Sequence, residues 1–346
     1  MTCTTVMNNI IEERYELCIC LARIANERDI KNKEKWELGE ETQEKLDLFT
    51  IPNHIKRMFG DFLKTPLYTE IKILDGHTDG VSCMTFHENK LYSGNYDKTI
   101  RVCNTETYEQ IANLRGHTGE VYCLTLNENK LYSGSGDNTI RVWNTDTHEI
   151  VAVLEGHTRY VSCMTIHENK LYSGSGSGDD SIHVWNTDTH EIVAVLEHPS
   201  WVNCLTIHKN KLYSGSWDET IRIWNTETYE EIAILIGQTG SVQCITIHEN
   251  KLYAGCWDTI SIWNTETYEQ IGCFGRHSGT VSCLTHYENK LVSAGGRDNT
   301  IWIWNTETYK EIATLEGHTG SVKCLTIHEN KLYSGGWDET IRVWKI

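Results

Sequence analysis

Serine, histidine and aspartate recur together at fixed spacings along this chain. In one set, Ser133 follows His117 by 16 residues and Asp137 follows it by 20. These three residue types can form a catalytic triad, in which the histidine takes the proton of the serine. However, complete sets occur in five copies of one segment, and enzymes rarely carry five equivalent active sites. We therefore predict a structural role for these residues and no catalytic site.

The segment that carries the sets, residues 116–143, is copied along most of the chain. Related segments start at Gly76, Gly156, Glu197, Gly237, Arg276 and Gly317, and the steps between copies are 39 to 41 residues. A period of this length, sustained over seven copies, is typical of a repeat architecture.

Each copy predicts four short antiparallel strands. In the second copy these are residues 121–126, 130–135, 139–143 and 149–154, rich in β-branched and aromatic residues and separated by Asn, Asp, Gly and Thr turns. Four such strands form one blade, and seven blades form an all-β propeller. The last copy stops after its third strand, so we expect residues 70–74 to supply the missing fourth strand and close the ring.

Residues 1–69 are predicted to be a helical extension preceding the propeller domain at 70–346. Residues 1–35 carry apolar side chains at helical spacing, and residues 53–65 could form a second, capped helix. A Cys-X-Cys pair, Cys18 and Cys20, has no second pair nearby and does not predict a metal site.

The repeats resemble the WD-repeat propellers. In most copies a Gly-His pair is followed about 20 residues later by an aspartate and then, six residues on, by a tryptophan, although Trp143-Asn144 stands where the family usually has Trp-Asp. The resemblance covers residues 70–346. The blade style of residues 163–174 is similar to F-box and related ligase-linked members of the family.

This resemblance implies a structural hydrogen-bond chain of His, Ser, Asp and Trp in each blade. The first copy has Cys103 in place of the tryptophan, and the fifth has Gln238 and Ala254 in place of the histidine and serine, a joint change expected to avoid leaving one buried donor alone. The complete sets are His117, Ser133, Asp137 and Trp143; His157, Ser173, Asp179 and Trp185; His198, Ser214, Asp218 and Trp224; His277, Ser293, Asp298 and Trp304; and His318, Ser334, Asp338 and Trp344.

The resemblance also implies that ligands mostly use the top face, on the side of the Gly-His loops. Three positions per copy reach it: the residues before and after the valine of the first strand, and the residue before the aspartate. Aromatic and basic residues at these positions are typical of interface hot spots, although a tryptophan before the aspartate could instead pack on a neighbouring loop. The candidate partner-binding residues are Tyr96, Tyr122, Tyr160, Trp201, Trp217, Trp257, Arg297, Lys323 and Trp337.

Two functions remain open. The first is a non-catalytic scaffold or adaptor that binds a protein or peptide on the top face and a second protein through the N-terminal helices. The second is the substrate-recognition subunit of a ubiquitin ligase, because residues 51–63 faintly resemble the opening of an F-box. Against it, the segment before the propeller is short for an F-box, and Arg297 and Lys323 are nearly alone as a basic cluster for a phosphorylated peptide.

No cofactor or metal is expected. Residues 174–179 look like a phosphate-binding loop but align as a two-residue turn insertion, and the histidines at 87, 167, 208, 248 and 328 occur once per blade. The net charge is −17, which disfavours binding to nucleic acid or an anionic membrane. Seven of the thirteen cysteines hold equivalent places, as expected for small buried residues in a reducing compartment. We expect an intracellular, cytoplasmic protein, with the nucleus left open.

Overall fold

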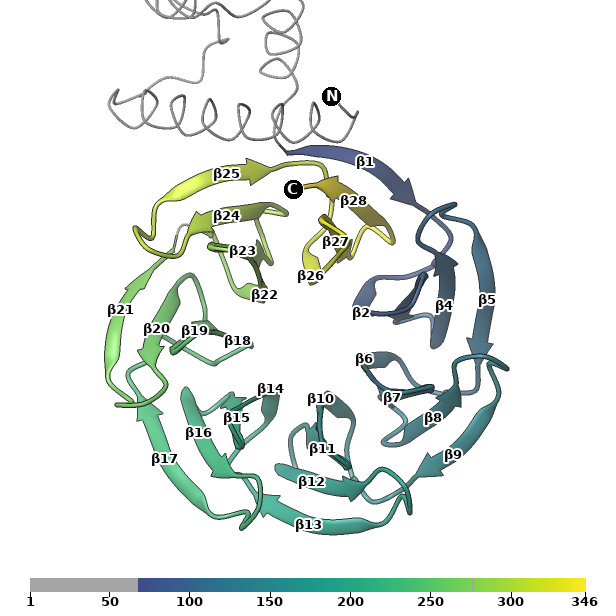
Figure 1. Ribbon diagram of the computed structural model, residues 1–346, viewed down its shortest axis with the longest axis horizontal. Coiled ribbons are helices and arrows are strands. Elements are labelled where there is room, and N and C mark those ends of the chain that lie inside the picture. The colour runs from purple at the N-terminus through teal and green to yellow at the C-terminus, as the bar shows by residue number, and fades with distance from the viewer. Residues whose placement is uncertain (1–67, 276) are drawn as a thin grey trace, which may run out of the picture. The chain divides into compact units, whose positions relative to one another are not determined.

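A computed structural model describes residues 68–275 and 277–346, which form seven four-stranded antiparallel sheets arranged around a central axis (Figure 1). The predicted all-β, seven-bladed propeller is confirmed. The predicted helices within residues 1–69 and the Cys18–Cys20 pair lie outside the described residues. Within the described ranges there is no helix that could cross a membrane.

Within each blade the first strand lies nearest the axis and the fourth lies at the circumference (Figure 1). Blades 1 to 3 consist of β2 (Val81–His87), β3 (Lys90–Asn95), β4 (Thr99–Asn104), β5 (Gln110–Arg115); β6 (Val121–Asn127), β7 (Lys130–Ser135), β8 (Ile140–Asn144), β9 (Ile150–Leu154); and β10 (Val161–His167), β11 (Lys170–Ser175), β12 (Ser181–Asn186), β13 (Ile192–Glu197).

Blades 4 to 7 repeat this order, and blade 7 takes its outermost strand from the start of the described chain. The strands are β14 (Val202–His208), β15 (Lys211–Ser216), β16 (Thr220–Asn225), β17 (Glu231–Ile236); β18 (Cys244–His248), β19 (Lys251–Gly255), β20 (Ile260–Asn264), β21 (Gln270–Phe274); β22 (Val281–Tyr287), β23 (Lys290–Gly295), β24 (Ile301–Asn305), β25 (Glu311–Leu315); and β26 (Val322–His328), β27 (Lys331–Gly336), β28 (Ile341–Lys345), β1 (Thr69–Leu74).

The ring is closed by β1, as the sequence predicts. This strand pairs antiparallel with β28, and Glu70 lies opposite Trp344 while Leu74 lies opposite Ile341. The carboxylate of Glu70 also contacts the guanidinium of Arg342. This pairing covers the edge of β28 and makes β1 the outermost strand of blade 7, as the fourth strand is in the other blades.

The hydrophobic core lies between blades. Seven buried clusters join successive blades, and in one of them Tyr132 and Ile140 of blade 2 pack with Val161 and Trp185 of blade 3. Gly134 permits this approach, since a Cβ there would lie 2.6 Å from Cγ1 of Val161. A methyl group at that distance would force the blades apart.

The repeated cysteines line these interfaces near the axis. All ten cysteines of the described residues are free. Burial raises the pKa of Cys163 to about 12. Burial also raises the pKa of the other six repeated cysteines, so the repeated thiols are protonated, packed side chains rather than reactive thiolates.

Candidate functional site: a ring of aromatic and basic side chains on the top face

A buried hydrogen-bond chain anchors the loop that carries the histidine. In blade 2, Nδ1 of His117 lies 2.8 Å from a carboxylate oxygen of Asp137, and its Nε2 lies 2.7 Å from Oγ of Ser133. Nε1 of Trp143 donates to the same Oγ at 2.8 Å. Ser133 is fully buried, which fits a structural role better than that of a nucleophile.

The aspartate of this chain is a strong acceptor. Burial by itself would raise the pKa of Asp137, but hydrogen bonds from His117 and Thr139 and from the N–H of Thr118 lower it well below its ordinary value. The ionised carboxylate therefore fixes the start of the histidine loop and the turn before β8. The same chain is present in blades 3, 6 and 7, through His157, Ser173, Asp179 and Trp185; His277, Ser293, Asp298 and Trp304; and His318, Ser334, Asp338 and Trp344.

Blade 4 departs from the expectation of a complete set. Trp224 donates to Ser214 at 2.9 Å, but both ring nitrogens of His198 are buried without a hydrogen-bond partner among the described residues. The cause is a shortened loop. Six residues separate Leu154 from Val161 in blade 3, whereas five separate the corresponding pair in blade 4, and the glycine before the histidine is missing.

In blade 5 the substitutions Gln238 and Ala254 are compensated by new hydrogen bonds only in part. Oε1 of Gln238 accepts a hydrogen bond from Ser261, so the glutamine finds a new partner. Nε1 of Trp263, however, is buried and unpartnered within the described part of the chain, because Ala254 has no hydroxyl to offer. Nε2 of Gln238 is likewise buried without a partner among the described residues. The prediction that the joint change avoids an unpaired donor is therefore wrong for both the tryptophan and the glutamine.

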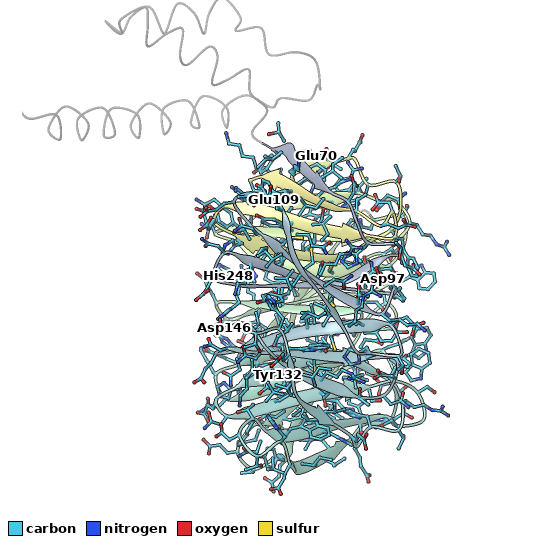
Figure 2. All side chains as sticks on the ribbon, turned by 90° about the vertical axis from the view of Figure 1, so that its right-hand side faces the viewer. Glu70, Asp97, Glu109, Tyr132, Asp146 and His248 are labelled. Carbon is cyan, nitrogen blue, oxygen red and sulfur yellow. The ribbon has the colours of Figure 1, made fainter. Side chains whose placement is uncertain are left out.

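The top face is set opposite the face of the Asn-Thr turns. In the side view, Asp97 of a histidine-loop set lies towards one face, and Asp146 and His248 lie towards the other (Figure 2). In six blades the innermost strand is irregular directly after its first valine, as between Val121 and Cys123. A bulge re-aims the side chain at the extra position, which here is Tyr122.

Six of the nine candidate residues form a continuous series of ring contacts, which we call the aromatic arc. It consists of Trp337, Tyr96, Tyr122, Tyr160, Trp201 and Trp217, with successive ring centroids 4.6, 5.6, 5.3, 6.3 and 5.0 Å apart. The arc therefore runs from blade 7 through blades 1, 2 and 3 to blade 4. Aromatic pairs at these separations stabilise one another beyond the apolar area that they bury.

The other candidates complete the circuit. Trp217, Trp257, Arg297 and Lys323 line a pocket of about 410 Å³ across blades 4 to 7, together with hydroxyl side chains such as Ser321. Nζ of Lys323 lies 5.8 Å from the centroid of the Trp337 ring, where the arc begins. All nine predicted residues thus belong to one circuit, which we call the top-face ring.

Packing and exposure coexist in this ring. Trp217, Trp257 and Trp337 keep 52%, 55% and 44% of their surface exposed, although Trp217 and Trp337 also contact neighbouring rings. Burial lowers the pKa of Lys323. A partly desolvated ammonium gains more from a ligand carboxylate than one in bulk water.

Some top-face positions serve the fold instead. The hydroxyls of Ser82, Ser162 and Ser282 donate to a valine carbonyl of the next blade, and Asn203 does so through its amide. Sequence reasoning also missed His183, which stacks on His157 at 3.9 Å between ring centroids. The sequence could have identified His183 as a departure from the repeat, since four other blades have arginine at the equivalent position.

The fold and the buried hydrogen-bond chains define a repeat propeller whose blades share a frame and differ at the top-face ring. The chain belongs to the family described as WD domain, G-beta repeat. The family model matches residues 68–104, 108–144, 148–186, 190–225, 268–305 and 309–345, more than half of the chain. The matched ranges leave out 226–267, which contains most of the divergent blade 5.

Curated relatives match over about one repeat. Two proteins named probable E3 ubiquitin ligase complex SCF subunit sconB, from Aspergillus clavatus and Aspergillus terreus, are 46% identical over 37 residues and 53% identical over 36. These segments are 11% and 10% of this chain and about 5% of either relative's length. Among solved structures, the computationally designed Ika8 protein is 25% identical with a TM-score of 0.67, covering 80% of this chain and 99% of its own.

Proposed function

We propose that this protein is a non-catalytic interaction scaffold whose top-face ring binds a segment of a partner protein. Propellers of this family are generally non-catalytic scaffolds. The observation that carries the proposal is the circuit itself: nine side chains chosen where the copies differ form one continuous aromatic and basic surface, in which four are exposed and five are half-buried. Exposed Trp, Tyr and Arg side chains are enriched in hot spots.

The ring has two kinds of subsite for a bound segment. The aromatic arc offers ring faces and edges to apolar side chains. The pocket places the cations of Arg297 and Lys323 beside serine and threonine hydroxyls, so it suits a carboxylate of the segment. A partner segment with an apolar stretch next to an acidic residue therefore fits the ring.

The test compares two double variants by affinity capture followed by binding measurements with the purified partner. In the first, Trp217 and Trp257 become alanine; in the matched control, Val151 and Ile236, which are 54% and 74% exposed on outer strands, become alanine. Each tryptophan that contributes should cost about 2 kcal/mol or more of binding free energy, while the melting temperature holds. A partner lost from the control variant and retained by the tryptophan variant would show that the ring is not the binding surface.

A ubiquitin-ligase subunit that recognises substrates is the second candidate. It is favoured by the similarity of one repeat to the sconB proteins, which are named as SCF subunits. Its adaptor-binding part would be residues 46–66, which lie outside the described residues. Co-purification of a ligase adaptor with the full chain, lost when residues 46–66 are removed, would support it. An adaptor that stays bound after the deletion would contradict this role for the segment.

We also propose that the protein works in the cytoplasm, since the ten cysteines of the described residues are all free, which suits a reducing compartment. Fluorescence microscopy of the tagged full chain tests this, and secretion of the protein would contradict it.

A further inference from the structure

Two departures from the repeat meet at one point in blade 3. The serine of the buried hydrogen-bond chain lies opposite an arginine in blades 1, 2, 4 and 7, as in the pair Ser133 and Arg141. In blade 3 the residue at this place is His183. The turn before Asp179 also carries the two-residue insertion, with Ser177 and Gly178 exposed to solvent. Blade 3 therefore places two histidines and an aspartate side by side beneath a lengthened, solvent-facing turn.

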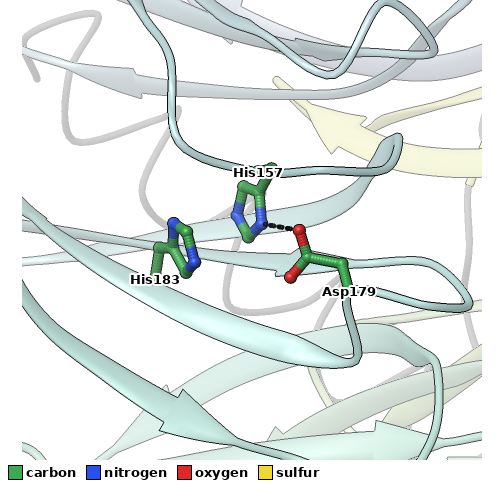
Figure 3. Close-up of side chains that lie close together, drawn as sticks. All are labelled: His157, Asp179 and His183. Atoms are coloured by element: carbon green, nitrogen blue, oxygen red, sulfur yellow. Dashed lines mark hydrogen bonds and ion pairs between the residues drawn. The ribbon is translucent and has the colours of Figure 1, made fainter.

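The three side chains are close and buried. The rings of His157 and His183 stack at 3.9 Å with an angle of 15° between their planes, and Asp179 contacts Nδ1 of His157 at 3.2 Å (Figure 3). One ligand atom from each of the three lies within 4.8 Å of the others. His183 is only 7% exposed, and its Nδ1 has no hydrogen-bond partner among the described residues.

The charge around the aspartate of blade 3 also differs from that in blades 4 and 7. In blades 4 and 7, a guanidinium nitrogen of Arg222 or Arg342 lies 4.0 Å from a carboxylate oxygen of the aspartate in the buried hydrogen-bond chain. In blade 3 an imidazole replaces the guanidinium, so the carboxylate of Asp179 lacks the neighbouring cation. A bound cation would restore it.

We propose that His157, Asp179 and His183 form a binding site for a divalent transition metal of the zinc type. Imidazole nitrogens and a carboxylate oxygen are donors that zinc accepts, at about 2.0–2.2 Å from the metal. The fourth position is left to water. Binding requires the three donor atoms to draw together from the present spread of up to 4.8 Å. It also requires the two stacked imidazole rings to turn until both ring planes contain the metal.

The hydrogen bonds of His157 and Ser173 can accommodate the metal. His157 would use Nδ1, the atom that now faces Asp179, and its Nε2 would carry the proton and donate to Oγ of Ser173, 2.8 Å away. The hydroxyl of Ser173 has its own acceptor in the carbonyl of His183, at 3.5 Å, while it keeps the hydrogen bond from Trp185. A ligating histidine whose second nitrogen is held in this way is the usual arrangement in metal sites.

The experiment is a titration of the full chain with ZnCl₂ after removal of metal with a chelator. The matched variant is His183→Arg, because it installs the residue that four other blades already hold; His183→Gln is a second variant that removes the ligand without adding charge. A third protein, Cys273→Ser, controls for binding by the exposed thiol. Heat release and melting temperature are recorded for each protein.

We expect the wild-type chain and Cys273→Ser to bind one equivalent more than either His183 variant, or to bind at least about tenfold more tightly. Zinc should raise the melting temperature of the wild type and leave that of His183→Arg unchanged, since only the folded wild type gains a ligand. Cobalt bound at the site should show no thiolate charge-transfer band. Equal stoichiometry and affinity in the wild type and His183→Arg, or no binding by the wild type, would overturn the proposal.

Discussion

Blade 5 offers a direct measurement of what the buried hydrogen-bond chain contributes. Nε1 of Trp263 is buried without a partner in the described structure, and Ala254 occupies the place where other blades hold the accepting serine. In those blades the tryptophan nitrogen and the serine oxygen lie 2.8–2.9 Å apart. Ala254→Ser adds one oxygen at that place, so we expect it to complete the missing bond.

The expected gain in stability follows from the unpaired state of the Trp263 N–H. A neutral hydrogen bond contributes about 0.5–1.5 kcal/mol net, and a buried donor without a partner costs about 1–3 kcal/mol. The added hydroxyl has to be accommodated in a site that is fully buried. We therefore expect Ala254→Ser to raise the free energy of unfolding by about 1 kcal/mol, and the melting temperature by roughly 2–4 °C.

The assay is a double-mutant cycle, read by urea and thermal unfolding. Trp263→Phe removes the indole N–H, so Ala254→Ser should give no gain in that background, and the coupling energy should be about 1 kcal/mol. An equal gain in both backgrounds would show that the serine acts through packing or the unfolded chain. No gain in either background would refute the assignment of Trp263 as an unpaired donor.

Three further outcomes are expected. Deletion of β1 (69–74) should unfold or aggregate the propeller, since it exposes the edge of β28; a soluble variant with a cooperative melt would contradict ring closure by this strand. His117→Ala should lower the free energy of unfolding by at least about 1 kcal/mol more than His198→Ala, because only the first removes hydrogen bonds to buried groups; equal losses in urea unfolding would contradict this. Burial, and then the neighbouring His248, lower the pKa of His286 from 6.5 to about 4, so the unfolded chain binds the proton first and stability falls as the pH drops across that window. His286→Ile, which installs the residue of four other blades, should flatten this decline in melts between pH 7 and pH 4; an unchanged slope would show that other groups cause it.

Much of the frame was predictable because each blade is built from local signals. The second strand of blade 2, predicted at residues 130–135, is observed at the same residues, and the first is one residue longer than predicted. Ring closure was also predictable, since counting strands left one missing at the end of the chain. Where a loop changed length, the prediction failed: His198 matches the pattern by residue type, but its shortened loop does not bring it to Ser214.

The candidate site divides in the same way. The repeat identifies the positions at which copies differ, and all nine chosen residues fall in the top-face ring. Their mutual contacts were not predictable, because Tyr160 and Trp201 belong to different blades and meet only after the ring forms. The stacking of His183 on His157 was not predictable either, although both belong to blade 3, because it joins residues 26 positions apart.

The sequence by itself determined the blade, the number of blades and the strand that closes them, since strand and turn signals are local and were repeated seven times. Only the tertiary structure decided which of the repeated polar residues have partners, because a hydrogen bond depends on loop length and on tenths of an ångström in position. It also decided that the departures from the repeat gather into one ring and one histidine cluster. The ring arises where separate blades meet, and the cluster arises where separate segments of blade 3 meet.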